Sequence, residues 1–168
     1  MEIDENIELW DAYNNYFTKI DGMVLQRGKS IPQGIYHLVC DIIVNHIDGS
    51  YLLMQRDYKK HLGGLWEATA GGSALSGETP FEYAKRELKE ETGIRECNLS
   101  EIGRVVHYSH QIIYYEFLAK VSIDKDSIIL QEGETISYKW VSKEELKSLS
   151  NNVLATKRII NFVDELSH

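Results

Sequence analysis

The segment Gly72-Ser-Ala-Leu-Ser-Gly-Glu-Thr-Pro-Phe-Glu-Tyr-Ala-Lys-Arg-Glu-Leu-Lys-Glu-Glu-Thr-Gly-Ile94 decides the fold. At ~100° per residue, its Glu87, Glu90 and Glu91 share one side of a helix with Arg86. Like charges at this spacing repel and weaken a helix, so we expect a cation to offset them. Oxygen-only ligands suit Mg²⁺ or Mn²⁺, which leave room for water and substrate phosphates.

Local chemistry predicts where this helix begins and ends. Thr79 is suited to the N-cap, Pro80 to the first helical position, and Glu82 completes a capping box with Thr79. Gly93 is a natural C-terminal stop. The apolar stripe of this helix is expected to consist of Phe81, Ala84 and Leu88. Its solvent-exposed face is expected to consist of Glu82, Lys85 and Lys89. The glutamate face therefore lies between core and water, where a cleft would be.

The residues of this segment resemble the signature of the MutT-like Nudix hydrolases. The signature requires Gly, five residues, Glu, seven residues, Arg-Glu, an aliphatic residue, one residue, Glu-Glu, one residue, Gly and an aliphatic residue. Every slot is filled, by Gly72, Glu78, Arg86, Glu87, Leu88, Glu90, Glu91, Gly93 and Ile94. So many fixed positions make the pattern far more specific than a lone glycine-rich loop. The resemblance implies an α+β fold, the Nudix α/β/α sandwich with a central mixed β-sheet.

The same resemblance implies roles for the motif residues. Glu87, Glu90, Glu91 and the backbone carbonyl of Gly72 would bind Mg²⁺ or Mn²⁺. Glu78 would contribute through water or an outer contact, and Arg86 would orient the glutamates. The reaction implied is hydrolysis of a diphosphate linkage, in which metal ions polarise phosphoryl oxygens and activate water. The general base varies within the family; Glu90 is the first candidate, and Glu132 and Glu134 are the alternatives.

Length and composition place further bounds on the protein. The 168 residues fit one domain, 1–168, and the formal net charge of −8 argues against broad nucleic-acid binding. The two cysteines, Cys40 and Cys97, have no metal-binding spacing, and no secretion signal or long apolar run is present. We therefore expect a cytoplasmic protein without a membrane segment, with Cys40 buried. Dimerisation is common in the family, so the resemblance allows a homodimer.

Hydrophobic patterns outline the rest of the chain. Residues 7–26 indicate an N-terminal hairpin that turns at Asp21-Gly22. Residues 36–46 read as a strand buried on both faces, and Asp48-Gly49 turns it into a strand over 51–55. Further strands are expected at 112–122 and 136–141, and Ser142 is expected to cap a short helix. An amphipathic helix is expected over residues 154–166.

A wider resemblance covers roughly residues 8–95 and points to the branch related to isopentenyl diphosphate isomerase. It implies that Arg56 and Lys59 or Lys60 contact a diphosphate; ordinary surface cations are an equally good interpretation. The isomerase cysteine position corresponds to Gly71 and a metal-binding histidine position to Ser73, although His37 is retained. Because the hydrolase glutamates are complete, the pattern favours hydrolysis.

The expected partner is a small diphosphate, either a nucleoside di- or triphosphate or a nucleoside diphosphate linked to another group. Two alternatives remain. One is isomerase-like activity, and the other is a non-catalytic nucleotide-sensing module.

Overall fold

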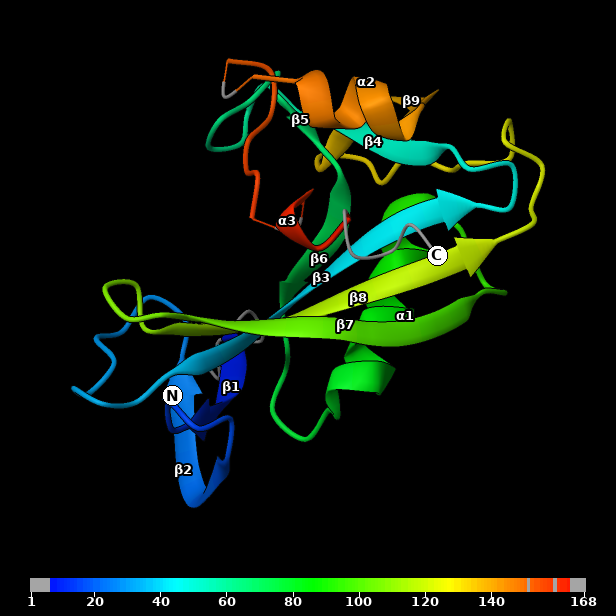
Figure 1. The fold of residues 1–168 in the computed structure, drawn as a ribbon. Coiled ribbons are helices and arrows are strands. Elements are labelled where there is room, and N and C mark those ends of the chain that lie inside the picture. Colours follow the sequence, from blue (N-terminus) through cyan, green and yellow to red (C-terminus); the bar gives the residue numbers. More distant parts are fainter. Residues whose placement is uncertain (1–6, 151, 159, 164–168) are drawn as a thin grey trace.

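The computed structural model describes residues 7–150, 152–158 and 160–163. Its elements, in chain order, are β1 (Leu9–Tyr13), β2 (Lys19–Gln26), β3 (His37–His46), β4 (Tyr51–Arg56), β5 (Trp66–Glu67), β6 (Thr69–Ser73), α1 (Pro80–Thr92), β7 (Asn98–His107), β8 (Ile112–Val121), β9 (Thr135–Val141), α2 (Lys143–Ser148) and α3 (Ile160–Val163). A seven-stranded sheet in the order β5-β4-β3-β8-β7 forms the centre; β6 also pairs with β3, and β9 with β4 (Figure 1). β3 and β8 run parallel, whereas β3–β4, β3–β6, β4–β9 and β7–β8 are antiparallel.

The mixed sheet carries helices on both faces, as the sequence predicted. Leu38, Cys40 and Ile42 of β3 belong to the core cluster that also holds Ala84 and Leu88 of α1. On the opposite face, Ile43 belongs to a second cluster with Leu146 of α2 and Val163 of α3. Alternation along a strand sends successive side chains to opposite faces, so β3 is apolar on both. The predicted α/β/α sandwich is confirmed.

The predicted boundaries of α1 are also confirmed. The Thr79 hydroxyl accepts a hydrogen bond from the Glu82 amide at 3.2 Å, and the Glu82 carboxylate accepts one from the Thr79 amide at 3.5 Å. Gly93 adopts φ +78 in the left-handed region and ends the helix. The apolar stripe was partly wrong. Phe81 is 43% exposed, and Tyr83 is buried in its place, because the stripe is rotated toward Gly72 and the glutamate face.

The N-terminal hairpin exists, but its predicted turn was wrong. β1 and β2 pair antiparallel, and the chain reverses over residues 14–18 rather than at Asp21-Gly22. The side-chain oxygen of Asn14 accepts bonds from the amides of Tyr16 and Thr18 at 2.9 and 3.1 Å. These hydrogen bonds to the asparagine side chain stabilise a turn at residues 14–18, and the chain reverses there instead of at Asp21-Gly22. Gly22 lies inside β2.

The predicted C-terminal helix was wrong over residues 154–158, which are not helical. Leu154 forms a β-bridge with Trp66, and the amide of Ala155 donates to the Trp66 carbonyl at 2.9 Å. These strand-like bonds occupy backbone groups that a helix would need. Helix α3 starts at Ile160 within the described residues, whereas the predicted positions 159 and 164–166 lie outside them. β5, β6 and β7 were not predicted.

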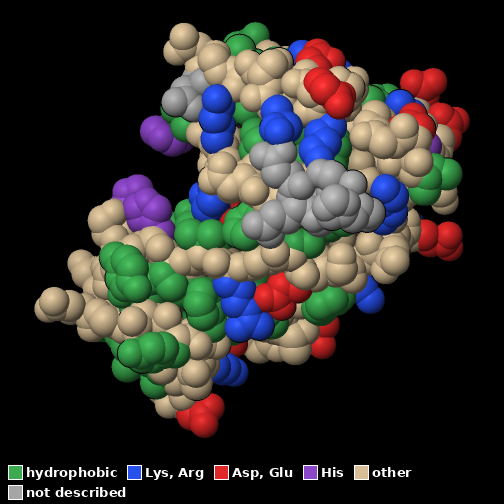
Figure 2. All heavy atoms as spheres, viewed as in Figure 1, with side chains coloured by type: hydrophobic (Ala, Val, Ile, Leu, Met, Phe, Trp, Pro, Cys, Tyr) green, Lys and Arg blue, Asp and Glu red, His purple; other side chains and the backbone are tan. Residues whose placement is uncertain are grey.

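Two surface properties are relevant to partners. Within the described residues, no helix is long and apolar enough to cross a membrane. On the face drawn in Figure 2, Lys and Arg side chains lie beside Asp and Glu side chains and form no broad basic field.

The two cysteines are both free thiols. Cys40 is buried, as expected, and Cys97 is partly buried.

Candidate active site

Arg86 connects the carboxylates at the exposed edge of α1. Its Nε and Nη2 donate to the two oxygens of Glu78, both at 2.8 Å. Its Nη1 donates to Glu87 Oε1 at 3.2 Å and to Glu90 Oε2 at 3.2 Å. The two-pronged bond from Arg86 lowers the pKa of Glu78. This geometry is what we expect if Arg86 orients the glutamates, a role that stays a prediction.

Glu91 lies deeper, between α1 and β6. Its Oε2 accepts a bond from the Gly71 amide at 3.3 Å. Burial, followed by the charge of Glu87, raises the pKa of Glu91 well above its ordinary value. Burial is also the main reason why the pKa of Glu87 is raised. The contact between Arg86 and Glu87 does not offset the burial of these two adjacent carboxylates, so their pKa values stay raised.

The backbone of Gly72 keeps a space open beside these carboxylates. A Cβ atom at Gly72 would lie 2.7 Å from the Tyr83 hydroxyl and 3.9 Å from Glu87 Oε2. The Tyr83 hydroxyl is buried and has no hydrogen-bond partner among the described residues. A site at this point therefore has an unsatisfied polar atom, two carboxylates and room that only glycine leaves.

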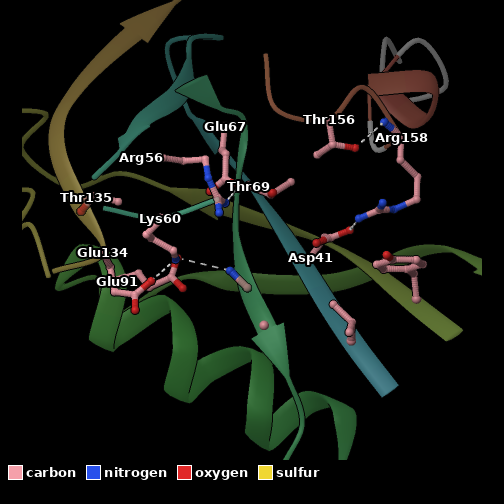
Figure 3. A pocket seen from close by; sticks show the side chains of 14 residues that line it. Asp41, Arg56, Lys60, Glu67, Thr69, Glu91, Glu134, Thr135, Thr156 and Arg158 are labelled. Atoms are coloured by element: carbon pink, nitrogen blue, oxygen red, sulfur yellow. Dashed lines mark hydrogen bonds and ion pairs between the residues drawn. The ribbon is translucent and has the colours of Figure 1, made fainter. Parts of the chain in front are cut away.

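The glutamates open into a cleft with two connected parts. The part of about 320 Å³ is lined by Glu87 and Glu90, and the part of about 210 Å³ by Arg56 and Glu67. Both parts share five lining residues: Lys60, Gly71, Gly72, Glu91 and Glu134. Figure 3 shows Lys60 pointing toward Glu134 and Glu91, and Lys60 Nζ forms an ion pair with Glu134. Glu134 comes from the loop before β9, so three separate segments supply this charge cluster.

The structure brings together most of the predicted site residues, but not all of them. Glu78 and Arg86 lie behind the cleft lining, joined to each other. Lys59 and Glu132 are exposed and outside the lining of either part. Arg56 lines the cleft, where it forms an ion pair with Glu67, a residue that the sequence analysis missed.

The donor set fits a hard divalent cation. In the described parts of the chain, no three His, Cys, Asp or Glu side chains converge as a ready-made metal cage; Arg86 binds Glu87 and Glu90 instead. The available donors are carboxylate and carbonyl oxygens, which Mg²⁺ and Mn²⁺ prefer. A bound cation would also stabilise the charged forms of Glu87 and Glu91, whose pKa values are raised mainly by burial.

The N-terminal hairpin contributes to the rim. Glu8 accepts bonds from Trp10 Nε1 at 2.7 Å and from Arg27 Nη1 at 3.0 Å, and both Glu8 and Arg27 line the cleft. His37 is buried and stacks on Trp10, with ring centroids 4.1 Å apart. Burial lowers the pKa of His37 to about 4, so the ring is neutral at physiological pH.

A buried ion triad forms the far wall of the cleft. Asp41 on β3 and Glu116 on β8 are register partners. Arg158 Nη2 binds Asp41, and Arg158 Nε donates to Glu116 Oε1 at 3.0 Å. The Arg158 guanidinium lies 3.5 Å from the centroid of the Tyr114 ring. The sequence analysis missed Asp41, Glu116 and Arg158.

Glu116 holds a proton in this triad. Burial, followed by the charge of Asp41, raises the pKa of Glu116 to about 9. Its Oε2 is buried without a hydrogen-bond partner among the described residues. A proton shared between Glu116 and Asp41 satisfies that oxygen. One proton on the two acids, with the charge of Arg158, makes the triad neutral overall.

Replacing Glu116 by Gln should change how stability depends on pH. The folded pKa of about 9 lies above the ordinary value of 4.5, so wild-type stability falls as pH rises between these values. A glutamine can donate to Asp41 and accept from Arg158 without titrating. We expect the free energy of unfolding of Glu116→Gln, relative to that of the wild type, to rise by up to about 1.4 kcal/mol per pH unit between about pH 5 and pH 8.

Urea unfolding at several pH values measures this difference in the free energy of unfolding, with the exposed Glu96→Gln variant as control. Parallel pH profiles for wild type and Glu116→Gln would contradict the shared proton.

Comparisons with known proteins agree with the predicted family. The sequence model of the NUDIX domain matches residues 35–162. An uncharacterized Nudix hydrolase of Listeria monocytogenes is 30% identical over 148 residues, which cover 87% of this chain and 86% of that protein. The uncharacterized Nudix hydrolase YfcD of Escherichia coli is 30% identical over 121 residues, covering 71% of this chain and 67% of YfcD.

Solved structures show the same fold at lower identity. DR0079 from Deinococcus radiodurans superposes with a TM-score of 0.75 at 15% identity, over 96% of this chain and 100% of that one. The NUDIX domain of Shewanella oneidensis NrtR, solved in complex with ADP ribose, superposes with a TM-score of 0.64 at 19% identity. The match covers 79% of this chain and 89% of that one. Taken with the NUDIX match over residues 35–162, these similarities establish that the chain belongs to the Nudix hydrolase family.

Proposed function

We propose that this protein catalyses metal-dependent hydrolysis of a diphosphate linkage. The substrate would be a nucleoside di- or triphosphate, or a nucleoside diphosphate joined to another group. The observation that carries the proposal is the single cleft in which Glu87, Glu90 and Glu91 face Lys60. Carboxylates suited to Mg²⁺ or Mn²⁺ and a cation suited to phosphate are the two halves of such a site.

The residues divide the chemical work between them. Glu87, Glu90, Glu91 and the Gly72 carbonyl would hold the metal, which when bound supplies phosphoryl polarisation and an acidified water. Lys60 and Arg56 would contact the diphosphate, with Lys60 exchanging its pairing with Glu134 for a phosphate oxygen. Glu134 would then be free to accept a proton. Glu90, 43% exposed at the cleft edge, is the other base candidate and our first choice.

Two observations support a nucleotide-like small molecule as the substrate. The cleft is small and charged, and the related NrtR domain binds ADP ribose. The net charge of −8 and the mixed surface in Figure 2 favour neither nucleic acid nor an anionic membrane as a partner. A cytoplasmic location and a homodimer remain part of the proposal; they rest on cysteine usage and on the family, respectively.

The backbone at Gly71 argues against isomerase-like activity. The isomerase cysteine would have to stand at this position. A Cβ atom at Gly71 would lie 2.0 Å from the Cys40 carbonyl oxygen, so no side chain fits on this backbone. His37, the remaining histidine of the isomerase metal set, packs against Trp10. Without a cysteine to protonate the alkene, hydrolysis is the better assignment.

A phosphate-release screen tests the proposal. Purified protein is incubated with nucleoside di- and triphosphates, nucleotide sugars and isopentenyl diphosphate, with Mg²⁺, with Mn²⁺ or with excess chelator. We expect metal-dependent cleavage of at least one nucleotide and no dimethylallyl product. Formation of dimethylallyl diphosphate would support the isomerase instead. Tight binding of a nucleotide without turnover, by a folded and metal-loaded protein, would support the sensing module.

A further inference from the structure

Beyond Gly71, the cleft continues as a short arm. This distal arm is lined by Val39, Asp41, Thr69, Tyr114, Thr156 and Arg158. Figure 3 shows Asp41, Thr156 and Arg158 on the opposite side of β6 from Glu91, Lys60 and Glu134. Lys60 lines both parts of the cleft, so the arm is one of two directions in which a group attached to a diphosphate at Lys60 can extend.

Asp41 is fixed at the wall of this arm by its neighbours. Arg158 binds one of its oxygens, and the Arg158 guanidinium is itself stacked on Tyr114. Glu116, which is fully buried, lies on the adjacent strand in register with Asp41. Buried ion groups of this kind contribute little to stability because desolvation offsets their attraction. Their position along a cleft is better explained by recognition of a ligand.

The size and polarity of the arm restrict what it can hold. The part of the cleft that contains it measures about 210 Å³, including the end near Glu91, whereas drug-sized ligands occupy pockets of about 300–1,000 Å³. The charge of Arg158 is already used by Asp41 and Glu116, so the arm offers no free positive charge to a second anionic group. An apolar chain would cover Asp41 without offering a hydrogen bond, at a cost in desolvation. A compact, neutral group with hydrogen-bond donors fits best.

We propose that Asp41 is a specificity-determining residue that accepts a hydrogen bond from a compact, neutral, donor-bearing group attached to the diphosphate. Arg158 and Glu116 are positioning residues that hold the Asp41 carboxylate in place. A sugar with free hydroxyls and a nucleoside with a single-ring base both supply this chemistry. The inference rests on the proposed diphosphate hydrolysis.

Binding calorimetry with uncleavable ligands and Mg²⁺ tests the assignment. The ligands share a methylenediphosphonate core, which is used bare or as its ribose, cytidine or geranyl ester. We expect the ribose or the cytidine ester to bind roughly 10- to 100-fold more tightly than the bare core, as for a hydrogen bond to a charged group. The geranyl ester should bind no more tightly than the bare core. Asp41→Asn should lower the gain in affinity of the polar esters about tenfold, whereas the exposed Asp126→Asn variant should leave this gain unchanged.

Three results would overturn the inference. The first is a geranyl ester that binds as much more tightly than the bare core as the polar esters do. The second is that neither polar ester binds more tightly than the bare core. The third is a folded Asp41→Asn protein in which the polar esters keep their full gain in affinity over the bare core. If Asp41→Asn fails to fold, the first two results, measured on the wild-type protein, still decide whether the arm recognises a polar group. Failure of the bare core to bind, with no anhydride cleavage in the screen, would instead remove the proposed function itself.

Discussion

Replacing Glu90 by Gln is expected to lower diphosphate hydrolysis by about 10²- to 10⁴-fold. The substitution removes one charge from the set that would hold the metal, and it removes the first candidate for the base. The Glu90 side chain is 43% exposed, and its ion-pair partner among the described residues is Arg86. We therefore expect the free energy of unfolding to change by no more than about 0.5 kcal/mol.

Steady-state kinetics and urea unfolding measure the two effects on the same preparation. Glu96→Gln is the matched control, because it removes an exposed carboxylate just beyond the helix. Wild-type turnover in Glu90→Gln would exclude Glu90 from the mechanism. Glu134→Gln separates the two base candidates: if Glu134 is the base, its variant loses the acidic limb of the pH–rate profile and Glu90→Gln retains that limb.

Replacing Gly71 by Ala is expected to destabilise the protein by at least about 3 kcal/mol or to prevent folding. The new Cβ would lie 2.0 Å from the Cys40 carbonyl oxygen and 3.2 Å from the Asp41 Cα. Both contacts are with the backbone of β3, the central strand, which pairs with β6 at this point. The side chain can be accommodated only if the β3–β6 pairing opens.

Gly49→Ala provides the control for backbone conformation alone. Gly49 has φ +96, and no atom lies within 4 Å of the position that its new methyl group would take, so Ala there should cost about 1 kcal/mol. The free energies of unfolding of both variants, measured in urea, separate the cost of an unfavourable backbone conformation from the cost of a steric clash with β3. A Gly71→Ala protein as stable as Gly49→Ala would show that β6 can shift. It would also remove the structural argument against a cysteine at position 71.

The features that the sequence predicted well depend on neighbours in the chain. Helix α1 was recognised because Thr79, Glu82 and Gly93 act within one turn of its ends. The strand at β3 was recognised because a mostly apolar run is typical of a strand buried on both faces. The glutamate face of α1 followed from helical spacing, which brings Glu87, Glu90 and Glu91 together without tertiary information.

The features that were missed depend on distant partners. β7 is an edge strand with a polar pattern, and its Gly103 is explained only by Phe162, whose ring would lie 2.3 Å from a Cβ there. The Asp41–Arg158 pair joins residues 117 positions apart. Asp41 and Glu116 did leave a signal, since each is a lone acid in an apolar strand, but the parallel register that pairs them cannot be read from the sequence.

Arg86 has a consequence for the order of events during biosynthesis. In many small metalloproteins the ligands repel one another until the metal arrives, so folding waits for metal. Here Arg86 already supplies Glu78, Glu87 and Glu90 with a counter-charge. Under the proposed function, the chain would fold first and load its cation afterwards. The supply of metal in the cell would then determine how many folded molecules are active, rather than how many molecules fold.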